Sequence, residues 1–232
     1  MSRVGDPERR LKSHKKRKAS SQAWLERQLS DPYVRLAREQ GWRSRAAFKL
    51  LELDDRFALL NGAKRVVDLG IAPGGWAQVV RKRAPRAAIV GIDLLEVEPI
   101  EGVTIFQMDF LDDDAPAVLT EALGGAPDLV LSDMAANTVG HKQTDHLRTM
   151  GLVEVAADFA INVLAEGGAF VTKGFAGGTD AALLAVLKRH FRVVKHAKPP
   201  ASRKGSSEWY MVAQGFKGRA APEAELALLD ES

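Results

Sequence analysis

Residues 65–76 read RVVDLGIAPGGW, a short β-branched run followed by an acid and by a turn rich in glycine and proline. A strand that passes through such a turn into a helix commonly begins an open α/β sheet. Glycines at this kind of turn let a ligand approach the backbone closely. The stretch therefore predicts an α/β domain with a ligand site at the end of its first strand.

Beyond this stretch, short β-branched runs alternate with helical stretches rich in alanine and leucine. Such alternation predicts a mostly parallel sheet with helices on both faces. The loop KPPASRKGSSE (198–208) joins the last two strands without a helical pattern, so we expect the seventh strand to be antiparallel to the other six. The expected strands are 65–69, 88–93, 103–107, 128–132, 169–173, 191–196 and 209–214, and the expected helices are at about 75–84, 114–123, 147–165 and 178–190.

The segment before the first strand predicts a further helix. Residues 41–57 read GWRSRAAFKLLELDDRF, with apolar side chains such as Phe48 and Leu51 at helical spacing. Ser44 precedes this periodic run and has a side chain suited to an N-cap. We therefore expect Ser44 to cap the helix.

Charge is unevenly distributed along the chain. Residues 1–49 hold 14 Lys and Arg against 5 Asp and Glu, whereas the remaining 183 residues have a net charge of −6. This asymmetry favours contact between the N-terminal part and a polyanion such as RNA or DNA, although a solubilising disordered tail would have the same composition. We expect a basic, flexible arm at residues 1–30, one domain at 31–216 and a polar tail at 217–232.

Composition excludes several classes of protein. The 232 residues include no cysteine, which rules out disulfides, thiolate metal sites and cysteine nucleophiles and fits a reducing compartment. The sequence has neither the apolar core of a signal peptide nor an apolar run long enough to span a bilayer. We therefore expect a cytoplasmic protein, monomeric and without a membrane partner.

Ionisable residues recur at the expected strand ends. Ligands of an open α/β sheet bind at the carboxyl ends of the parallel strands. The residues expected at this edge are Asp68, Asp93, Asp109, Asp133 and Lys173. Because the last strand is reversed, Glu208 at its start is expected at the same edge. This joint placement predicts one functional site there.

The turn after the first strand departs from the dinucleotide fingerprint. Ala72 stands where the middle glycine of G-x-G-x-x-G would let the backbone close on a pyrophosphate. Pro73 removes a backbone donor, and Asp68 adds a negative charge near the place of a phosphate. These features favour a ligand that carries positive charge, such as S-adenosylmethionine, over NAD. Asp93 would then accept bonds from the ribose hydroxyls and Asp109 from the adenine amino group. A turn without a ligand remains the alternative.

The remaining residues of the edge suggest acid–base chemistry. Lys173 could form an ordinary salt bridge, but burial and a second cation can lower the pKa of a lysine until it acts as a base. Lys49, on the helix before the first strand, could be that second cation. Asp133 and Glu208 would hold the two ammonium groups in position. The sequence thus predicts a site formed by Lys49, Asp133, Lys173 and Glu208.

Seven short motifs resemble those of a known family. They are RSRAAFKL, VVDLGIAPGGW, GIDLL, MDF, SDMAANT, FVTKGF and KPPASRKGSSEWY. In content and spacing they resemble the FtsJ/RrmJ-type ribosomal RNA 2′-O-methyltransferases, and within these the bacterial large-subunit methyltransferase E family, over about residues 31 to 215. The resemblance implies the Rossmann-like fold of S-adenosylmethionine-dependent methyltransferases, with a seven-stranded, mostly parallel sheet.

The resemblance also implies roles for particular residues. A Lys-Asp-Lys-Glu tetrad of that family corresponds to Lys49, Asp133, Lys173 and Glu208 in this sequence. The cofactor contacts of the family correspond to Gly74, Trp76, Asp93, Asp109 and Asp133. The chain departs from the family pattern at Ala136, where a proline is usual, at Ile71, which replaces a smaller residue, and in its longer basic arm.

From these residues we expect methyl transfer from S-adenosylmethionine to a ribose 2′-hydroxyl, with Lys173 as the base and no metal ion. By resemblance the acceptor is a uridine in 23S rRNA of the large ribosomal subunit. The basic N-terminal arm, together with Arg43, Arg45, Arg203 and Lys204, would bind the RNA backbone. Three alternatives remain: a 2′-O-methyltransferase for tRNA or an mRNA cap, a non-catalytic RNA-binding protein of the same fold, and, least favoured, a nicotinamide oxidoreductase.

Overall fold

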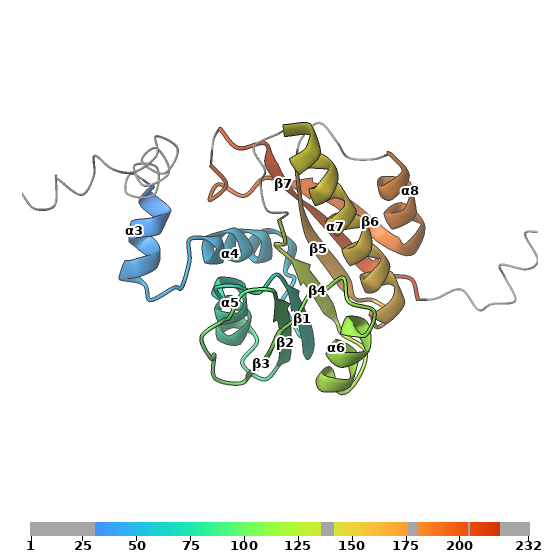
Figure 1. The fold of residues 1–232 in the computed structure, drawn as a ribbon, viewed down its shortest axis with the longest axis horizontal. Helices are drawn as coiled ribbons and strands as arrows, with labels where there is room; N and C mark the ends of the chain where they lie inside the picture. Colours follow the sequence, from blue (N-terminus) through green and yellow to red (C-terminus); the bar gives the residue numbers. More distant parts are fainter. Residues whose placement is uncertain (1–30, 136–141, 176–180, 204, 219–232) are drawn as a thin grey trace, which may run out of the picture.

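A computed structural model of the chain describes residues 31–135, 142–175, 181–203 and 205–218. The expected N-terminal arm, most of the expected tail, Ala136 and Lys204 lie outside these residues. Figure 1 shows a central sheet with helices on both of its faces. The helices are α3 (Pro32–Glu39), α4 (Ala46–Phe57), α5 (Gly75–Arg83), α6 (Ala115–Leu123), α7 (Lys142–Val163) and α8 (Ala181–His190).

The strands form one sheet of seven in the order β3-β2-β1-β4-β5-β7-β6. Pairing is parallel from β3 to β5, and β7 is antiparallel to both of its neighbours. The expected fold, with six strands in one direction and the last one reversed, is therefore confirmed. The strands are β1 (Arg65–Leu69), β2 (Ala88–Asp93), β3 (Val103–Gln107), β4 (Leu129–Ser132), β5 (Ala169–Phe175), β6 (Phe191–Ala197) and β7 (Glu208–Phe216).

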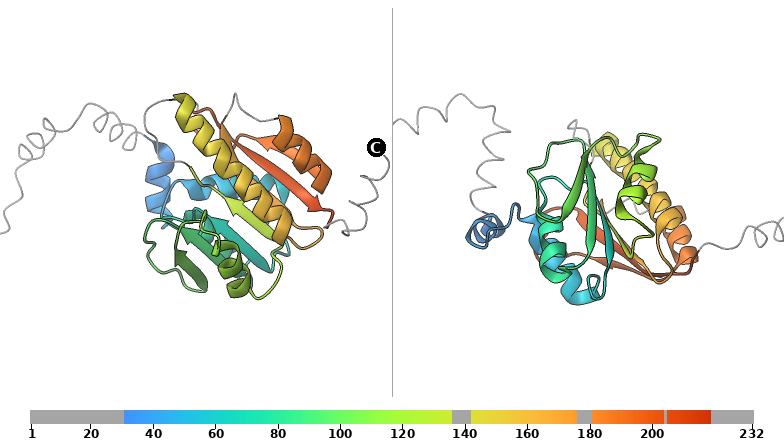
Figure 2. Two further views of the ribbon diagram at one scale, coloured as in Figure 1. Left: turned by 45° about the vertical axis from the view of Figure 1, so that its right-hand side comes forward. Right: turned by 90° about the horizontal axis from the view of Figure 1, so that it is seen from below.

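The core has two layers because alternate residues of a strand point to opposite faces of the sheet. Val66 of β1 packs with residues of α4 and α5, whereas Val67 packs with residues of α6, α7 and α8. Figure 2 shows the same division, with α4 and α5 on one side of the sheet and α6, α7 and α8 on the other. Strands β1, β2 and β4 are buried over most of their length, which explains their continuous apolar sequences.

Two local predictions need correction. The residue that precedes α4 is Arg45, and α4 has no side-chain capping bond; the Ser44 hydroxyl is instead buried without a hydrogen-bond partner among the described residues. The helix expected at 147–165 begins at Lys142, five residues earlier. Polar residues at its start hide the helical periodicity, which becomes clear only where the helix packs on the sheet.

No helix among the described residues is both long enough and apolar enough to cross a membrane.

Candidate active site

The turn after β1 brings the backbone into close contact with its surroundings at two glycines. Gly70 has a φ of +77° and Gly74 a φ of +103°, values that favour glycine. A Cβ on Gly74 would lie 2.5 Å from the side chain of Ile100. Gly74 precedes α5, so the turn leads directly from the carboxyl end of β1 to the start of that helix. Backbone geometry therefore explains why this position is glycine.

Asp93, at the carboxyl end of β2, fixes the turn in place. One carboxylate oxygen accepts a hydrogen bond of 2.9 Å from the backbone N–H of Ala72, and the other accepts one of 2.9 Å from Leu95. Asp109, after β3, accepts a bond of 3.0 Å from the N–H of Leu111 through one oxygen. Both carboxyl groups are therefore oriented by backbone donors, while lone pairs remain for a ligand.

A cavity of about 340 Å³ opens at this edge of the sheet. Its volume is in the range of small-ligand sites. The wall combines apolar side chains with three carboxylates, those of Asp93, Asp109 and Asp133. The full lining is Gly70, Ala72, Ile92, Asp93, Leu94, Leu95, Met108, Asp109, Phe110, Leu111, Asp133, Met134, Ala135 and Leu152.

Two of the expected cofactor residues do not line this cavity. Gly74 lies on the far side of the turn, against Arg43 and Ile100. The Trp76 side chain is buried, donates a 2.8 Å bond to the carbonyl of Ala46 and lies with its ring 5.7 Å from that of Tyr210. In this structure Trp76 packs α5 against α4 beneath the site.

The four ionisable residues of the expected tetrad form one connected chain of contacts. Lys49 Nζ lies 2.8 Å from each carboxylate oxygen of Glu208 and donates a 3.0 Å bond to the Tyr210 hydroxyl. That hydroxyl donates a 2.8 Å bond to Asp133 Oδ1. The same oxygen lies 3.0 Å from Lys173 Nζ. Two lysines and two carboxylates are thus linked through a tyrosine that the sequence analysis does not assign to the site.

Sheet pairing explains why these groups meet. Lys173 of β5 is paired with Tyr210 of β7, and β7 begins at Glu208. Asp133 follows the end of β4, the neighbour of β5, and its N–H donates to the carbonyl of Leu69. Lys49 reaches the edge from α4, where its side chain is only 8% exposed. The register of β7 places Tyr210 on the same face as Glu208, because alternate residues of a strand share a face.

The electrostatics of the site favour a charged Asp133. Burial by itself would raise the pKa of Asp133, because it disfavours the charged carboxylate. The positive charges of Lys173 and Lys49 outweigh this effect, together with hydrogen bonds from Tyr210 and Lys173. The pKa of Asp133 therefore lies below its usual range. Burial, together with the charges of Asp133 and Glu208, raises the pKa of Tyr210 well above its usual value. Tyr210 therefore remains a neutral hydrogen-bond donor between Lys49 and Asp133.

Glu208 is held from its other side by the loop between β6 and β7. The Ser202 hydroxyl donates a 2.9 Å bond to Glu208 Oε1. The loop is fixed to α4 at Ala201, whose N–H donates to Glu52 at 2.7 Å and whose carbonyl accepts from Arg45 at 2.5 Å. Ser202 is a second site residue that the sequence analysis missed, since a lone serine in a loop carries no signal.

The arginines expected to grip RNA are engaged within the protein. Arg45 lies 2.9 Å and Arg203 lies 3.1 Å from the carboxylate of Asp31. Arg43 bonds to three backbone carbonyls around the turn, those of Pro73, Glu98 and Pro99. Their guanidinium groups orient the turn and the β6–β7 loop. For Arg43 and Arg45 this structural use differs from the expected contact with a phosphate backbone.

Asp68 is the least usual group at this edge. It lies on β1, is 1% exposed, and neither of its carboxylate oxygens has a hydrogen-bond partner among the described residues. Burial, with the charges of Asp133 and Asp93, raises the pKa of Asp68 to about 8. At neutral pH the Asp68 carboxyl group is therefore mostly protonated in this structure, because burial and the neighbouring carboxylates disfavour its charge.

We expect the Asp68→Asn substitution to change the free energy of unfolding more favourably at pH 8 than at pH 5. A pKa raised above its ordinary value of 3.8 means that the contribution of Asp68 to stability is complete below about pH 4 and is lost as the pH rises to about 8. Between pH 5 and 8 the free energy of unfolding of the variant, relative to that of wild type, should rise by a few kcal/mol, since one pKa unit corresponds to about 1.4 kcal/mol. Thermal unfolding of the ligand-free proteins measures it; a difference independent of pH would contradict the prediction.

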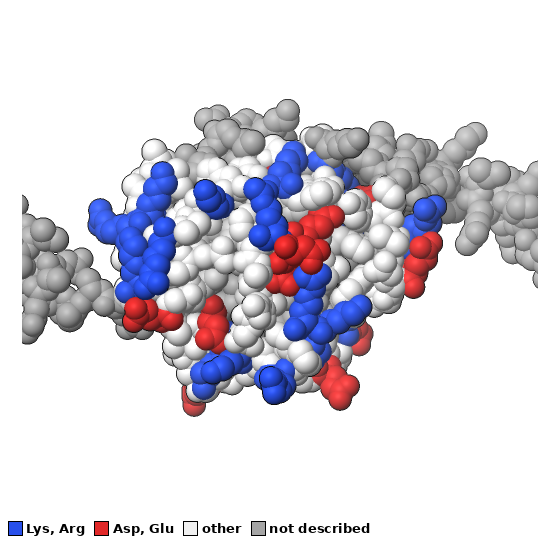
Figure 3. Space-filling model, turned by 180° about the vertical axis from the view of Figure 1, so that it is seen from behind, with Lys and Arg blue, Asp and Glu red and all other residues white. Residues whose placement is uncertain are grey.

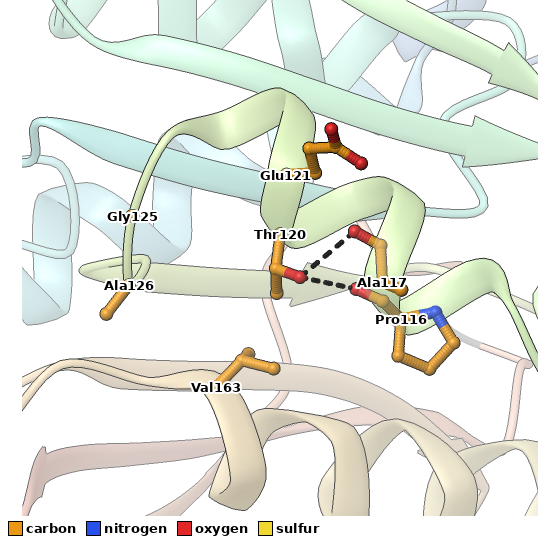
Figure 4. Close-up of a pocket in the computed structure, with 7 residues that line it drawn as sticks. All are labelled: Pro116, Ala117, Thr120, Glu121, Gly125, Ala126 and Val163. Atoms are coloured by element: carbon orange, nitrogen blue, oxygen red, sulfur yellow. Dashed lines mark hydrogen bonds between the residues drawn. The ribbon is translucent and has the colours of Figure 1, made fainter.

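A second hollow lies away from this edge, between α6 and the end of α7 (Figure 4). Its volume is about 680 Å³. The Thr120 hydroxyl bonds to the carbonyls of Pro116 and Ala117 in its own helix, and Glu121 is the only ionisable residue in the lining. The hollow thus lacks a cluster of reactive groups, in contrast to the cavity at the carboxyl edge.

The fold and the site together define a protein of the Rossmann-like methyltransferase class. Residues 42–216 match the model of the family described as FtsJ-like methyltransferase. The chain belongs to this family, and it is therefore a methyltransferase.

Individual relatives agree with this assignment. The chain is 75% identical to a protein of Novosphingobium aromaticivorans named ribosomal RNA large subunit methyltransferase E, over 92% of this chain and 96% of that protein. A protein of the same name from Erythrobacter litoralis is 73% identical, over 94% of this chain and all of that protein. A solved structure from Plasmodium falciparum, described as a ribosomal RNA methyltransferase, has a TM-score of 0.68 and 32% identity, over 77% of this chain and 100% of that chain.

Proposed function

We propose that this chain transfers the methyl group of S-adenosylmethionine to a ribose 2′-hydroxyl, that of a uridine in 23S rRNA of the large ribosomal subunit. The observation that carries the proposal is the connected chain Glu208–Lys49–Tyr210–Asp133–Lys173 beside an acid-lined cavity. The names of the relatives from Novosphingobium aromaticivorans and Erythrobacter litoralis support the choice of RNA. Residues 31–216 would form the catalytic domain.

The cavity fits S-adenosylmethionine in charge. Its wall carries three carboxylates, and the buried Asp68 beside it lacks a partner among the described residues. A ligand with an ammonium and a sulfonium group would offset this negative charge, whereas a pyrophosphate would add to it. Asp93 and Asp109 would hold the ribose and the adenine. Once bound, the cofactor supplies a methyl group on a positively charged sulfur.

The acceptor hydroxyl needs a base, and we assign this role to Lys173. A neutral Lys173 amine would accept the proton of the 2′-hydroxyl. The bound S-adenosylmethionine would supply the methyl group, whose bond to sulfur breaks as its bond to the 2′-oxygen forms, and would leave as S-adenosylhomocysteine. The Asp133 carboxylate, 3.0 Å from Lys173 Nζ, stabilises the ammonium that results. Glu208 and Tyr210 hold Lys49 in position on the other side of Asp133. Alignment of the hydroxyl with the methyl group supplies much of the remaining acceleration.

The test of this function is a comparison of RNA acceptors. The purified protein would be incubated with labelled S-adenosylmethionine and with large subunits from a strain lacking this activity, free 23S rRNA, tRNA or capped transcripts. We expect label on a ribose of 23S rRNA, mapped to a uridine. Label on tRNA or on the cap alone would favour the alternative acceptors. Cofactor binding without label on any RNA would favour a non-catalytic RNA-binding protein.

A further inference from the structure

A concentration of basic residues lies outside the site described above. Residues 181–203 contain six Lys and Arg and no Asp or Glu, although residues 50–232 as a whole have a net charge of −6. Five of these six cations, all except Arg203, which is paired with Asp31, join a lysine that follows β7 to form what we call the β6 stripe. Its members are Lys188, Arg189, Arg192, Lys195, Lys198 and Lys217.

The fold presents these side chains to the surroundings of the protein. Among the described strands, β6 is the outer one of the sheet next to β7 and pairs with β7 alone. All six residues of the stripe are exposed, and so is Val193 on the same strand. Figure 3, the view from behind, shows Lys and Arg side chains gathered at its left-hand edge, the side of the molecule on which β6 and α8 lie.

The positive charge of the stripe is largely unneutralised. Among the described residues, Arg192 is the only member within 4 Å of a carboxylate, that of Glu166 at 3.9 Å. Both of those side chains are about two-thirds exposed or more (66% and 71%), so the pair is weak. Lys198 and Lys217 donate to backbone carbonyls, which leaves their charges unbalanced.

The stripe leads to the catalytic edge. The last residue of β6, Ala197, is paired with Tyr210, and Lys198 follows at once. From Arg192 to Lys198 an extended chain covers about 20 Å. A strand of a nucleic-acid duplex, with one phosphate per about 3.4 Å of its axis, presents about six phosphates over that length. Arg192 and Lys195 thus extend from opposite faces of this outer strand, and the strand ends next to Tyr210, the residue that contacts Lys49.

We propose that the β6 stripe binds the sugar–phosphate backbone of the RNA substrate at a distance from the methylated nucleotide. The proposal rests on the proposed function and specifies where the rest of the RNA lies. Phosphate contacts fix the position and orientation of a nucleic acid without reading its sequence. The stripe would thus add affinity for the large subunit and leave the chemical step to the residues around Lys173.

A different role for the same charges must be distinguished by the test. Outer strands often carry lysines that prevent pairing with another copy of the chain. Charge of either sign serves this purpose, whereas only positive charge binds phosphate. Replacing lysine and arginine by glutamate therefore separates the two roles, because it keeps the protection of the strand and removes the attraction for RNA.

The experiment compares wild type with the double variant Arg192→Glu/Lys195→Glu. Its matched control is Lys64→Glu/Arg86→Glu, two exposed cations outside the stripe. We expect the stripe variant to raise KM for large subunits at least about ten-fold near physiological salt, with kcat and the affinity for S-adenosylmethionine within about two-fold. A neutral version, Arg192→Gln/Lys195→Gln, should reduce the slope of log K against log salt by about 1.5 to 2. The control should behave as wild type.

The possible results have distinct meanings. Normal KM and salt dependence in the stripe variants, with an active wild type, would overturn the proposal and leave the proposed function intact. Equal losses in the stripe and control variants would show an effect of overall charge and also overturn it. If the glutamine variant self-associates in light scattering while the glutamate variant keeps the wild-type KM, the proposal is also overturned. The stripe would then serve to prevent β6 from pairing with another copy of the chain. If the wild-type protein transfers no methyl group to any RNA, the proposed function itself is contradicted.

Discussion

The Lys173→Ala variant should lose methyl transfer to large subunits by about 1,000-fold or more while it binds S-adenosylmethionine within about three-fold of wild type. General-base catalysis contributes roughly 100- to 10,000-fold, and loss of the amine also leaves the Asp133 carboxylate without its 3.0 Å partner. Single-turnover transfer with labelled cofactor measures the first effect. Equilibrium binding of the cofactor measures the second.

Two further variants make the assignment of Lys173 specific. Lys173→Arg keeps the positive charge but cannot supply a neutral base, because a guanidinium stays protonated. It should therefore remain inactive. Lys173→Met keeps the apolar stem and tests whether the alanine variant fails only because it packs poorly. Transfer by the arginine variant near the wild-type rate would mean that Lys173 acts through its charge.

The Asp133→Asn variant should lose both activity and stability. The substitution keeps the shape of the side chain but leaves the poorly exposed Lys173 ammonium without its 3.0 Å anionic partner and removes a negative charge near Lys49. We expect transfer to fall by about 100-fold or more and the free energy of unfolding to fall by about 2 kcal/mol at pH 7. Denaturant unfolding and single-turnover transfer measure the two effects.

The loss of stability in Asp133→Asn should depend on pH with a definite sign. The pKa of Asp133 lies below its ordinary value of 3.8, so the stability that it contributes is present above that value and is lost as the pH falls further. The difference in free energy of unfolding between wild type and variant should therefore be largest at pH 7 and decrease as the pH is lowered through about 4. Asp113→Asn, at an exposed acid, is the control. A constant difference across this range would contradict the ion-pair explanation.

Much of the fold was predictable because its signals are local. The β-branched run, the glycine turn and the alternation with helical stretches lie within short windows of the sequence, and the structure has the predicted strands to within a few residues. The start of α7 and the cap of α4 were predicted wrongly. At Ser44 tertiary packing outweighed a local preference, since its hydroxyl is buried and makes no capping bond. At the start of α7, polar residues hid the helical periodicity.

Part of the site was predictable for a similar reason. The rule that ligands bind at the carboxyl ends of parallel strands selected Asp93, Asp109, Asp133 and Lys173, and the structure places them at one edge. Tyr210 and Ser202 were not assigned to the site. A tyrosine on a buried strand has the same sequence signal whether it fills the core or bridges Lys49 and Asp133. Its hydroxyl gains that role only from neighbours on two other elements.

The sequence by itself determined the class of fold, the ligand turn and the identity of the charged residues at the edge of the sheet, because spacing of two or of about four residues specifies strands and helices locally. Tertiary structure alone decided which charges became partners. Lys49 and Glu208 are 159 positions apart and meet at 2.8 Å, while Arg43 and Arg45, whose charge suggested RNA, are bonded within the protein. Buried charges require partners, and which partners are within reach is set by the packing of α4 and the register of β7.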